Sequence, residues 1–200
     1  MPNGSEVYVI DDDEAIRGSL AFLLRTAGFV ARAYDSAQVF LAEAADLAPG
    51  CVITDVRMPG LDGIELVRRL AAAKLPLAAI VVTGHGDIAM AVEAMKAGAV
   101  DFLEKPFRDE VLLRAVERAL GGPALPDAAD RQRDRAALQA LSPRERQVLE
   151  GVVSGKTSKA IARDLDISPR TVEVHRAGMM MKSGAKSLSD LVRMALLAGL

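Results

Sequence analysis

The sequence contains one cysteine and two histidines, and no apolar run approaches the length of a membrane span, which is about 20 residues. Cys51 has no partner for an intrachain disulfide, and its place at the head of an apolar run predicts a buried thiol. His85 and His175 stand far apart, so we expect no His/Cys cluster for a structural zinc. The N-terminus has no basic segment followed by an apolar stretch, so we expect no secretory signal, no membrane partner and a cytoplasmic location.

The formal net charge of −2 conceals an uneven distribution of charge along the chain. Residues 1–130 contain 12 Lys and Arg against 20 Asp and Glu, a net charge of −8, whereas residues 131–200 contain 13 against 7, a net charge of +6. A chain of 200 residues has room for two domains. We therefore expect an acidic unit followed by a basic one, the second suited to a polyanion such as nucleic acid.

Short apolar runs alternate with amphipathic helical patterns over the first 120 residues. Five such strand–helix units predict an α/β domain with a flavodoxin-like, doubly wound, five-stranded parallel sheet. The ligand site of such a sheet lies at the carboxyl ends of the strands, where the winding reverses. The predicted strands are Glu6–Ile10, Phe29–Tyr34, Cys51–Thr54, Leu77–Val82 and Val100–Glu104.

Polar residues stand at the ends of these predicted strands: Asp11, Asp12, Asp13, Asp55, Thr83 and Lys105. Clustered carboxylates repel one another, and a hard cation such as Mg²⁺ offsets that cost. We expect Asp12 and Asp55 to be Mg²⁺ ligands and Asp11 to contribute through a water molecule. Together with the Thr83 hydroxyl and the Lys105 ammonium, these groups are suited to forming an acyl phosphate on a carboxylate.

Four motifs in this part of the chain resemble the receiver domain of two-component response regulators: Val9-Ile10-Asp11-Asp12-Asp13, Thr54-Asp55-Val56-Arg57-Met58-Pro59-Gly60, Val82-Thr83-Gly84 and Lys105-Pro106-Phe107. The resemblance covers residues 6–120. It implies that a sensor histidine kinase phosphorylates Asp55 and that the peptide bond before Pro106 is cis. It also implies that Mg²⁺ is held by Asp12, Asp55 and the backbone carbonyl of Arg57.

The same resemblance implies a switch and a dimer surface. The residues that match the family's Thr/aromatic pair are Thr83 and Phe102. Because Phe102 lacks the hydroxyl of the commoner Tyr, we expect a switch that works by packing. Phosphorylated receivers of this kind form homodimers through the helix over residues 89–97 and the last strand, and the residues expected there are Val92, Met95, Lys96 and Phe102.

A basic helical segment follows the sheet domain. The run Gly121-Gly122-Pro123 predicts a linker over residues 121–137, whose charged part suits either an exposed helix or a tether. Ser142 with Glu145 forms a predicted capping box, and Ser168-Pro169 and Ser187 are further helix starts. About four short helices, forming a small all-α domain over residues 138–200, are expected.

Two of these helices, Thr157–Leu165 and the one capped by Ser168, flank a short turn, which predicts a helix-turn-helix whose second helix enters the major groove. The lysines are expected to contact phosphates, whereas Glu173, Val174 and Arg176 have the chemistry to read cytosine, thymine and guanine. The expected DNA contacts are Lys159, Arg170, Thr171, Glu173, Val174, His175, Arg176 and Lys182.

The motifs Ser142-Pro143-Arg144-Glu145, Ser158-Lys159-Ala160-Ile161-Ala162 and Thr171-Val172-Glu173-Val174-His175-Arg176 resemble the LuxR/NarL-type DNA-binding domain. With the receiver motifs in front, the chain resembles the FixJ-like regulators. Gly178 and Ser183-Gly184 depart from the family pattern, and they predict a recognition helix with a shorter or looser end.

The sequence thus predicts a transcription factor that is phosphorylated on Asp55, dimerises, binds promoter DNA and acts on RNA polymerase. We expect no enzymatic activity beyond slow autodephosphorylation. Two alternatives stay open at this point. One is a phosphoryl-accepting interaction module without DNA output. The other is a phosphatase with an Asp nucleophile, against which Ala15 counts because it stands where such an enzyme has Thr or Val.

Overall fold

The structure of the chain is a computed structural model that describes residues 4–84, 88–121 and 128–199. It divides into two compact units, residues 1–86 with 97–123 and residues 87–96 with 124–200. The first unit contains the sheet, and the second is helical. By this division all of α4 (Ile88–Ala97) except Ala97 falls in the second unit, although it precedes the last strand of the sheet along the chain.

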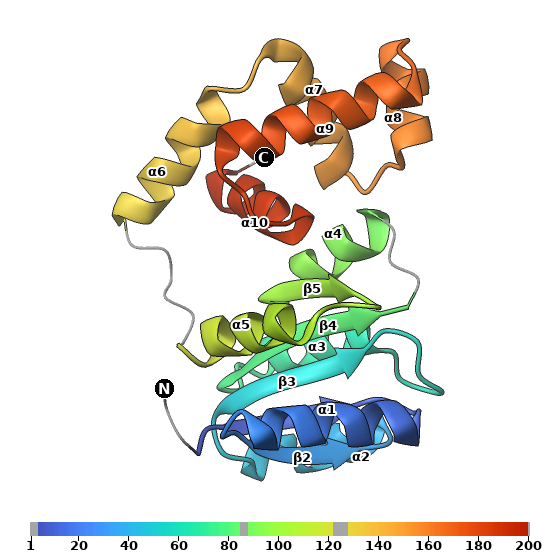
Figure 1. The fold of residues 1–200 in the computed structure, drawn as a ribbon, viewed down its shortest axis with the longest axis vertical. Helices are drawn as coiled ribbons and strands as arrows, with labels where there is room; N and C mark the ends of the chain where they lie inside the picture. Colours follow the sequence, from blue (N-terminus) through green and yellow to red (C-terminus); the bar gives the residue numbers. More distant parts are fainter. Residues whose placement is uncertain (1–3, 85–87, 122–127, 200) are drawn as a thin grey trace. The chain divides into compact units, whose positions relative to one another are not determined.

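The first unit is built on one parallel sheet with the strand order β2-β1-β3-β4-β5 (Figure 1). This confirms the predicted doubly wound fold. The strands are β1 (Glu6–Ile10), β2 (Val30–Tyr34), β3 (Gly50–Asp55), β4 (Leu77–Thr83) and β5 (Asp101–Glu104). Asp55 and Thr83, predicted to follow their strands, are the last residues of β3 and β4.

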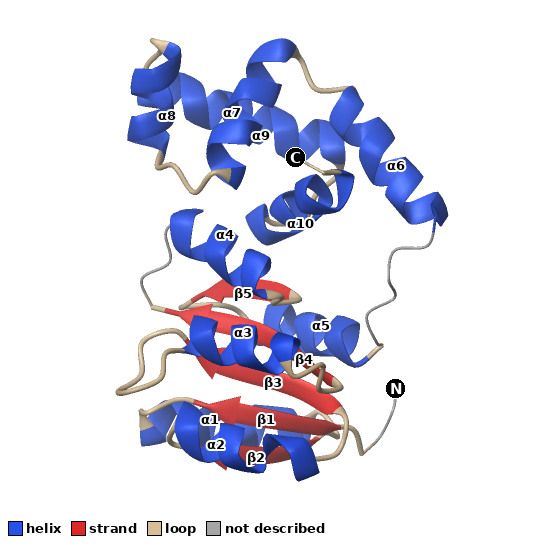
Figure 2. Cartoon of the chain, turned by 180° about the vertical axis from the view of Figure 1, so that it is seen from behind, coloured by secondary structure: helices blue, strands red, loops and turns tan. Residues whose placement is uncertain are grey.

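Helices cover both faces of the sheet, with α1 and α5 on one face and α2 and α3 on the other (Figures 1 and 2). This burial of both faces explains why the strands read as nearly continuous apolar runs. The helical elements of the first unit are α1 (Glu14–Thr26), α2 (Ala37–Glu43), the short 3₁₀ helix Ala44–Asp46, α3 (Gly63–Ala72) and α5 (Asp109–Leu120).

Side chains on the two faces of the sheet enter separate apolar layers. On the face covered by α1 and α5, Ile53 and Ile80 pack in one cluster with Leu24 and Leu112. Cys51 belongs to this cluster and is fully buried, as predicted, and burial raises the pKa of its thiol. The core thereby fixes the strands whose ends carry the polar residues.

The register of β1 and β3 aligns their carboxyl ends. Ile10 of β1 is paired with Thr54 of β3, so the residues that follow, Asp11 and Asp55, lie side by side at one edge of the sheet. The chain passes from β1 outward to β2 and then returns to β3 on the other side of β1. The winding therefore reverses between β1 and β3, which is where ligands bind in open sheets of this kind.

The second unit contains α6 (Ala128–Gln139), α7 (Pro143–Val153), α8 (Ser158–Leu165), α9 (Pro169–Ser183) and α10 (Leu188–Ala198). The predicted capping box of Ser142 and the predicted caps at Ser168 and Ser187 are confirmed. α6 occupies much of the segment predicted as a linker and packs against α10 and α9. Within the described parts of the chain, no helix combines the length and the apolar character needed to cross a membrane.

The end of α9 lies at Ser183-Gly184, one of the positions that depart from the family pattern. α9 continues without interruption through Gly178 to Ser183, and Gly184 then ends it in the left-handed conformation, with φ of 71°. Gly178 therefore does not shorten the helix. Glycine is favoured at such a helix end because it adopts positive φ without a steric penalty.

Candidate functional site

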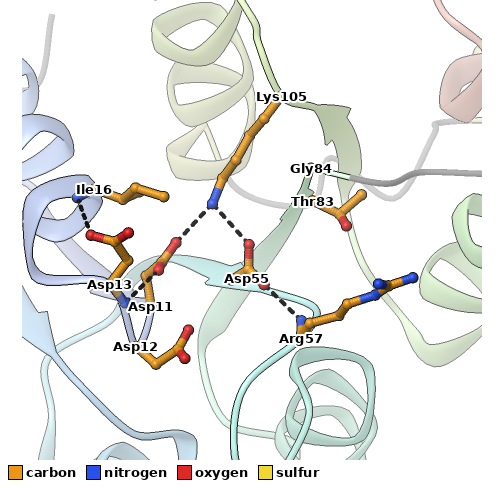
Figure 3. Close-up of a pocket in the computed structure, with 9 residues that line it drawn as sticks. All are labelled: Asp11, Asp12, Asp13, Ile16, Asp55, Arg57, Thr83, Gly84 and Lys105. Atoms are coloured by element: carbon orange, nitrogen blue, oxygen red, sulfur yellow. Dashed lines mark hydrogen bonds and ion pairs between the residues drawn. The ribbon is translucent and has the colours of Figure 1, made fainter.

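The carboxyl edge of the sheet forms an open cavity of about 230 Å³. Every residue predicted at the strand ends lines it, so the structure brings the predicted set together (Figure 3). The lining residues are Asp11, Asp12, Asp13, Ile16, Asp55, Arg57, Thr83, Gly84 and Lys105. They come from the ends of β1, β3, β4 and β5 and from the start of α1.

Lys105 lies between two carboxylates of this cavity. Its Nζ donates to Oδ2 of Asp11 and to Oδ1 of Asp55, each at 2.8 Å. Burial by itself lowers the pKa of Lys105, but the hydrogen bonds and charges of the two carboxylates outweigh this, and the pKa is raised. The ammonium therefore stays charged and offsets the repulsion between Asp11 and Asp55.

Asp11 is held in place on every side. It is 2% exposed, and its Oδ1 accepts a hydrogen bond from the backbone N–H of Asp13 at 3.0 Å. Its backbone N–H donates to the carbonyl of Tyr34 at 3.2 Å, and its own carbonyl accepts from Arg17 at 2.7 Å. Asp11 is thus a fixed wall of the cavity, whereas the neighbouring Asp12 is exposed.

Asp55 is 8% exposed at the end of β3, next to Val82 of β4. Its Oδ2 accepts from the backbone N–H of Arg57 at 2.6 Å, while its Oδ1 accepts from Lys105. Asp13 plays a different part, because its Oδ1 accepts from the N–H groups of Ala15 and Ile16 and so caps α1. Asp55 is therefore an oriented carboxylate, held by one ammonium and one backbone donor.

The far side of the cavity is formed by β4 and β5. Thr83 is 1% exposed and lines the cavity, and the peptide bond between Lys105 and Pro106 is cis, as the family resemblance implied. Phe102 is half-buried on β5, opposite Val81. Because residues i and i+2 of a strand share a face, Thr83 and Phe102 lie diagonally on one face of the sheet. His85, considered from sequence as a neighbour of the site, lies outside the described residues.

The donor set of the cavity suits a hard divalent cation. Across residues 4–84, 88–121 and 128–199, no group of three or more His, Cys, Asp or Glu side chains forms a closed metal cage. Mg²⁺ does not require such a cage, because it is commonly bound by one or two carboxylates and retains several waters. Asp12 and Asp55 line one cavity, and Lys105 already balances the buried charge of Asp11. The residues present therefore fit Mg²⁺.

The helical unit carries a second candidate site, the pair α8 and α9. Ile161 and Ala162 of α8 and Val172 of α9 are buried. The turn between the helices is tight because Asp166 adopts the left-handed conformation, with φ of 53°, and Ser168 then caps α9. The geometry is that of a helix-turn-helix.

The predicted DNA contacts differ in exposure and in their partners. The exposed ones are Lys159, Arg170, Glu173, Val174 and Lys182, and the half-buried ones are Thr171, His175 and Arg176. Val174 is 64% exposed on α9, so its side chain is accessible for the predicted contact with a thymine methyl.

Glu173 and Arg176, predicted as separate base contacts, interact with each other. Arg176 Nη1 lies 3.0 Å and 3.1 Å from the two carboxylate oxygens of Glu173. Ser158, at the start of α8, donates to the same carboxylate at 2.6 Å. Ser158 was not among the residues predicted for this site. The only sequence feature that could have indicated this role is that Ser158 is a polar residue directly after the cap of α8.

Two further residues at the sites were not predicted. Arg17 supports the acidic loop by donating a hydrogen bond to the carbonyl of Asp11. The sequence feature that could have indicated this contact is a basic residue one turn into the helix that follows the acidic run. Glu145 was predicted only as part of a capping box, but its carboxylate also accepts from Lys182 at 2.7 Å. Among the residues expected in the dimer surface, Val92 and Met95 are buried, Lys96 is exposed and Phe102 is half-buried.

Comparison with known proteins connects the two sites. Residues 7–117 match the family of response regulator receiver domains, and residues 139–195 match the luxR family of bacterial regulatory proteins. The chain is 54% identical to the transcriptional regulatory protein FixJ of Bradyrhizobium diazoefficiens, over 100% of this chain and 98% of that protein. It is 56% identical to FixJ of Rhizobium meliloti, over 96% of each.

A solved structure agrees with these relatives. The crystal structure of full-length FixJ from B. japonicum is similar with a TM-score of 0.58 and 54% sequence identity, covering 98% of this chain and 97% of that one. Receiver domains generally bind Mg²⁺ at their phosphorylation site, and regulators with this domain pair have a histidine kinase partner, bind DNA and are typically not enzymes. The chain belongs to the FixJ-like two-component response regulators, transcription factors that join a receiver domain to a LuxR-type DNA-binding domain.

Proposed function

We propose that Asp55 is the phosphoacceptor and that its modification controls DNA binding by α8 and α9. Residues 1–120 act as the receiver, residues 121–137 as the connection and residues 138–200 as the DNA-binding domain. The observation that carries the proposal is the position of Lys105 Nζ, 2.8 Å from both Asp11 and Asp55. A carboxylate oriented beside an ammonium is suited to accept a phosphoryl group, because the cation stabilises the charge that develops on the phosphoryl oxygens.

In the proposed reaction an oxygen of Asp55 attacks the phosphorus of a phosphohistidine on the kinase. The O–P bond forms as the N–P bond breaks, and the leaving imidazole takes a proton from water. Lys105 and Thr83 then contact the phosphoryl oxygens. Asp12, Asp55 and the backbone carbonyl of Arg57 would hold Mg²⁺, with Asp11 acting through a water molecule, and the ion would supply further positive charge at these oxygens.

Phosphorylation of Asp55 causes a conformational change that extends from Thr83 to the dimer surface. A new dianion beside Thr83 favours a state in which its hydroxyl turns towards the phosphoryl group, and Phe102 on the neighbouring strand repacks. Homodimers then form through the helix that contains Lys96 and through β5. Because Val92 and Met95 are buried, their participation requires that this helix change its surroundings. Dimers present two copies of α9 to promoter DNA and contact RNA polymerase there. A cytoplasmic location is part of this proposal.

The test uses the full chain with acetyl phosphate and Mg²⁺. The wild type is expected to gain one phosphoryl group by intact mass and to shift to a dimer in size-exclusion chromatography. Asp55→Asn is expected to do neither, while Asp62→Asn, which alters the cap of α3 at a residue that does not line the cavity, is the matched control. An Asp55→Asn protein that is still phosphorylated and still dimerises would refute the assignment. Steady release of inorganic phosphate would instead support a phosphatase.

A second measurement separates a transcription factor from a phosphoryl-accepting module without DNA output. The phosphorylated full chain is incubated with a randomised duplex pool, and bound duplexes are recovered and sequenced. A common sequence motif, bound with an affinity that falls as salt rises, supports DNA output. Recovery of no enriched sequence contradicts it.

A further inference from the structure

Glu145 is a buried carboxylate that joins two helices of the DNA-binding domain. It stands in the first turn of α7 and is 6% exposed. Its Oε2 accepts from the backbone N–H of Ser142 at 2.7 Å, which completes the capping box, and also from Lys182 Nζ at 2.7 Å. Lys182 belongs to the last turn of α9. One carboxylate therefore begins α7 and holds the end of α9.

Gly178 provides the space for this carboxylate. It lies four residues before Lys182 and hence on the same side of α9. A Cβ atom added at Gly178 would lie 2.7 Å from Oε1 of Glu145, closer than van der Waals contact allows. The two oxygens of Glu145 thus have separate roles, since Oε2 receives the hydrogen bonds and Oε1 fits against a position on α9 that has no side chain.

The charges of this contact are permanent at ordinary pH. The hydrogen bond from Lys182, followed by the backbone hydrogen bond at Ser142, lowers the pKa of Glu145 to about 2. Because Glu145 is 6% exposed, loss of the Lys182 ammonium leaves its carboxylate with only the donors of the capping box at Ser142. The contact is therefore suited to fix α9 against α7 rather than to act as a titrating switch.

We propose that Glu145 is a positioning residue for DNA recognition. It holds the C-terminal half of α9 through Lys182, and Gly178 leaves room for its carboxylate. The inference rests on the proposed entry of α9 into the major groove. It reassigns Lys182, which acts inside the domain and not as a contact to DNA phosphate. The residues expected to read bases, from Arg170 to Arg176, occupy the other half of the same helix, so the contact at its end sets their angle of approach.

The first test is hydrogen exchange on the full chain. Glu145→Gln keeps a residue suited to the capping box but removes the charge, and Lys182→Met removes the ammonium. Both are expected to speed amide exchange in peptides covering residues 169–183 at least severalfold, while peptides from β1 and β3 stay unchanged. Lys182→Arg is expected to restore protection. Unchanged exchange in residues 169–183 of both variants would overturn the proposal.

The second test uses the space at Gly178. In the wild-type background, Gly178→Ala is expected to speed exchange of α9, because the new methyl group meets Oε1 of Glu145. In a Glu145→Ala background the obstacle is gone, and the same substitution is expected to slow exchange, because alanine favours a helix more than glycine does. An effect of the same sign in both backgrounds contradicts the role of Gly178.

The third test measures binding to a duplex recovered from the selection described above, over a range of salt. A lysine that contacts a phosphate contributes about 0.9 to the slope of log affinity against log salt. Lys182→Met is expected to weaken binding severalfold and leave this slope unchanged, whereas Lys159→Met, the comparator, reduces it. A reduced slope for Lys182→Met would mean that Lys182 contacts a DNA phosphate, which contradicts the proposal. If the wild type binds no duplex, the proposed function fails, and hydrogen exchange alone decides the role of Glu145.

Discussion

Lys105 Nζ lies 2.8 Å from Oδ1 of Asp55, although fifty residues separate the two along the chain. The contact exists because β3, which ends at Asp55, and β5, which Lys105 follows, both run parallel to β4, so that their carboxyl ends reach one edge. The ammonium thus rests beside the oxygen of the proposed acceptor before any phosphoryl group arrives. Because it is preorganised, it needs little rearrangement when negative charge develops there.

Lys105→Met is expected to slow phosphorylation of Asp55 by acetyl phosphate about 10²-fold, the cost typical of removing one preorganised charge-stabilising group. Substitution also leaves Asp11 and Asp55 without the cation that balances them. The rate is measured from intact mass against time. Lys74→Met, which removes an exposed ammonium on the turn after α3, is the control and should react like the wild type. Equal rates for the two variants would remove Lys105 from the reaction.

A substitution beneath the acceptor tests how closely the backbone is packed there. A Cβ atom at Gly63 would lie 2.0 Å from the carbonyl oxygen of Asp55, and backbone has little freedom to yield. Gly63→Ala is expected to destabilise the receiver by about 1–3 kcal/mol, the usual range for overpacking, and to slow phosphorylation. Gly18→Ala is the control, because a Cβ atom there meets nothing within 4 Å. It should stabilise α1 by up to about 1 kcal/mol.

Urea unfolding of the full chain measures this change in the receiver alone. The sequence has no tryptophan and two tyrosines, and both, Tyr8 and Tyr34, lie in the first unit. Tyrosine fluorescence therefore reports on the sheet and not on the helical domain. Equal stability of the Gly63→Ala and wild-type proteins would mean that α3 moves away from β3 more easily than its packing indicates.

Patterns that are local in sequence predicted most of the fold and of the receiver site. A strand is recognised from a short apolar run, and a parallel sheet brings every strand end to one edge, so Asp11, Asp55 and Lys105 could be expected to meet without knowledge of the strand order. Helix starts such as Ser142 were also predictable, because the cap and its partner are only three residues apart.

Contacts that a long charged side chain makes with another helix were not predictable in the same way. Lys182 and Glu145 are 37 residues apart, and Arg176 and Ser158 are 18 apart. A basic residue on a recognition helix carries the same local signal whether it binds DNA or a carboxylate of its own domain. Only the packing of α9 on α7 distinguishes the two, and that packing depends on the shape of the whole core.

The stability of the helical domain is expected to depend on the charge of Glu145. Its pKa is lowered from 4.5 to about 2 in the folded chain, chiefly by the hydrogen bond from Lys182. A carboxylate with a depressed folded pKa stabilises the fold above its unfolded pKa, and this contribution is lost as the pH falls towards the folded value. Wild type should therefore exceed Glu145→Gln in stability at neutral pH, and the difference should shrink between pH 4.5 and 2.

Unfolding of the helical domain is measured by urea titration at neutral pH and at about pH 3. The NMR methyl signals of Met179 and Met194, both buried in the helical unit, report on this unfolding. Glu150→Gln, at an exposed position of α7, serves as the control for removal of a carboxylate. A difference between wild type and Glu145→Gln that does not change with pH would mean that the two side chains differ in packing and not in charge.

The pair formed by Glu173 and Arg176 leads to a prediction about DNA affinity. If the two side chains read bases independently, the effects of Glu173→Ala and Arg176→Ala on binding add. Because Arg176 Nη1 lies 3.0 Å from Glu173 Oε1, we expect the effects to be coupled by about 0.5–3 kcal/mol in a double-mutant cycle. Loss of Glu173 releases the guanidinium of Arg176, so the second substitution costs less in the first variant than in the wild type.

The cycle is measured by fluorescence anisotropy with the selected duplex and the phosphorylated full chain. Glu173 with Lys186 is the control pair, since both are exposed, Lys186 lies beyond the end of α9, and no ion pair joins them in the described part of the chain. Its coupling should stay near zero, because only a shared contact makes two substitutions depend on each other. Additive effects at Glu173 and Arg176 would mean that the ion pair breaks when α9 enters the groove, and that each side chain then contacts DNA separately.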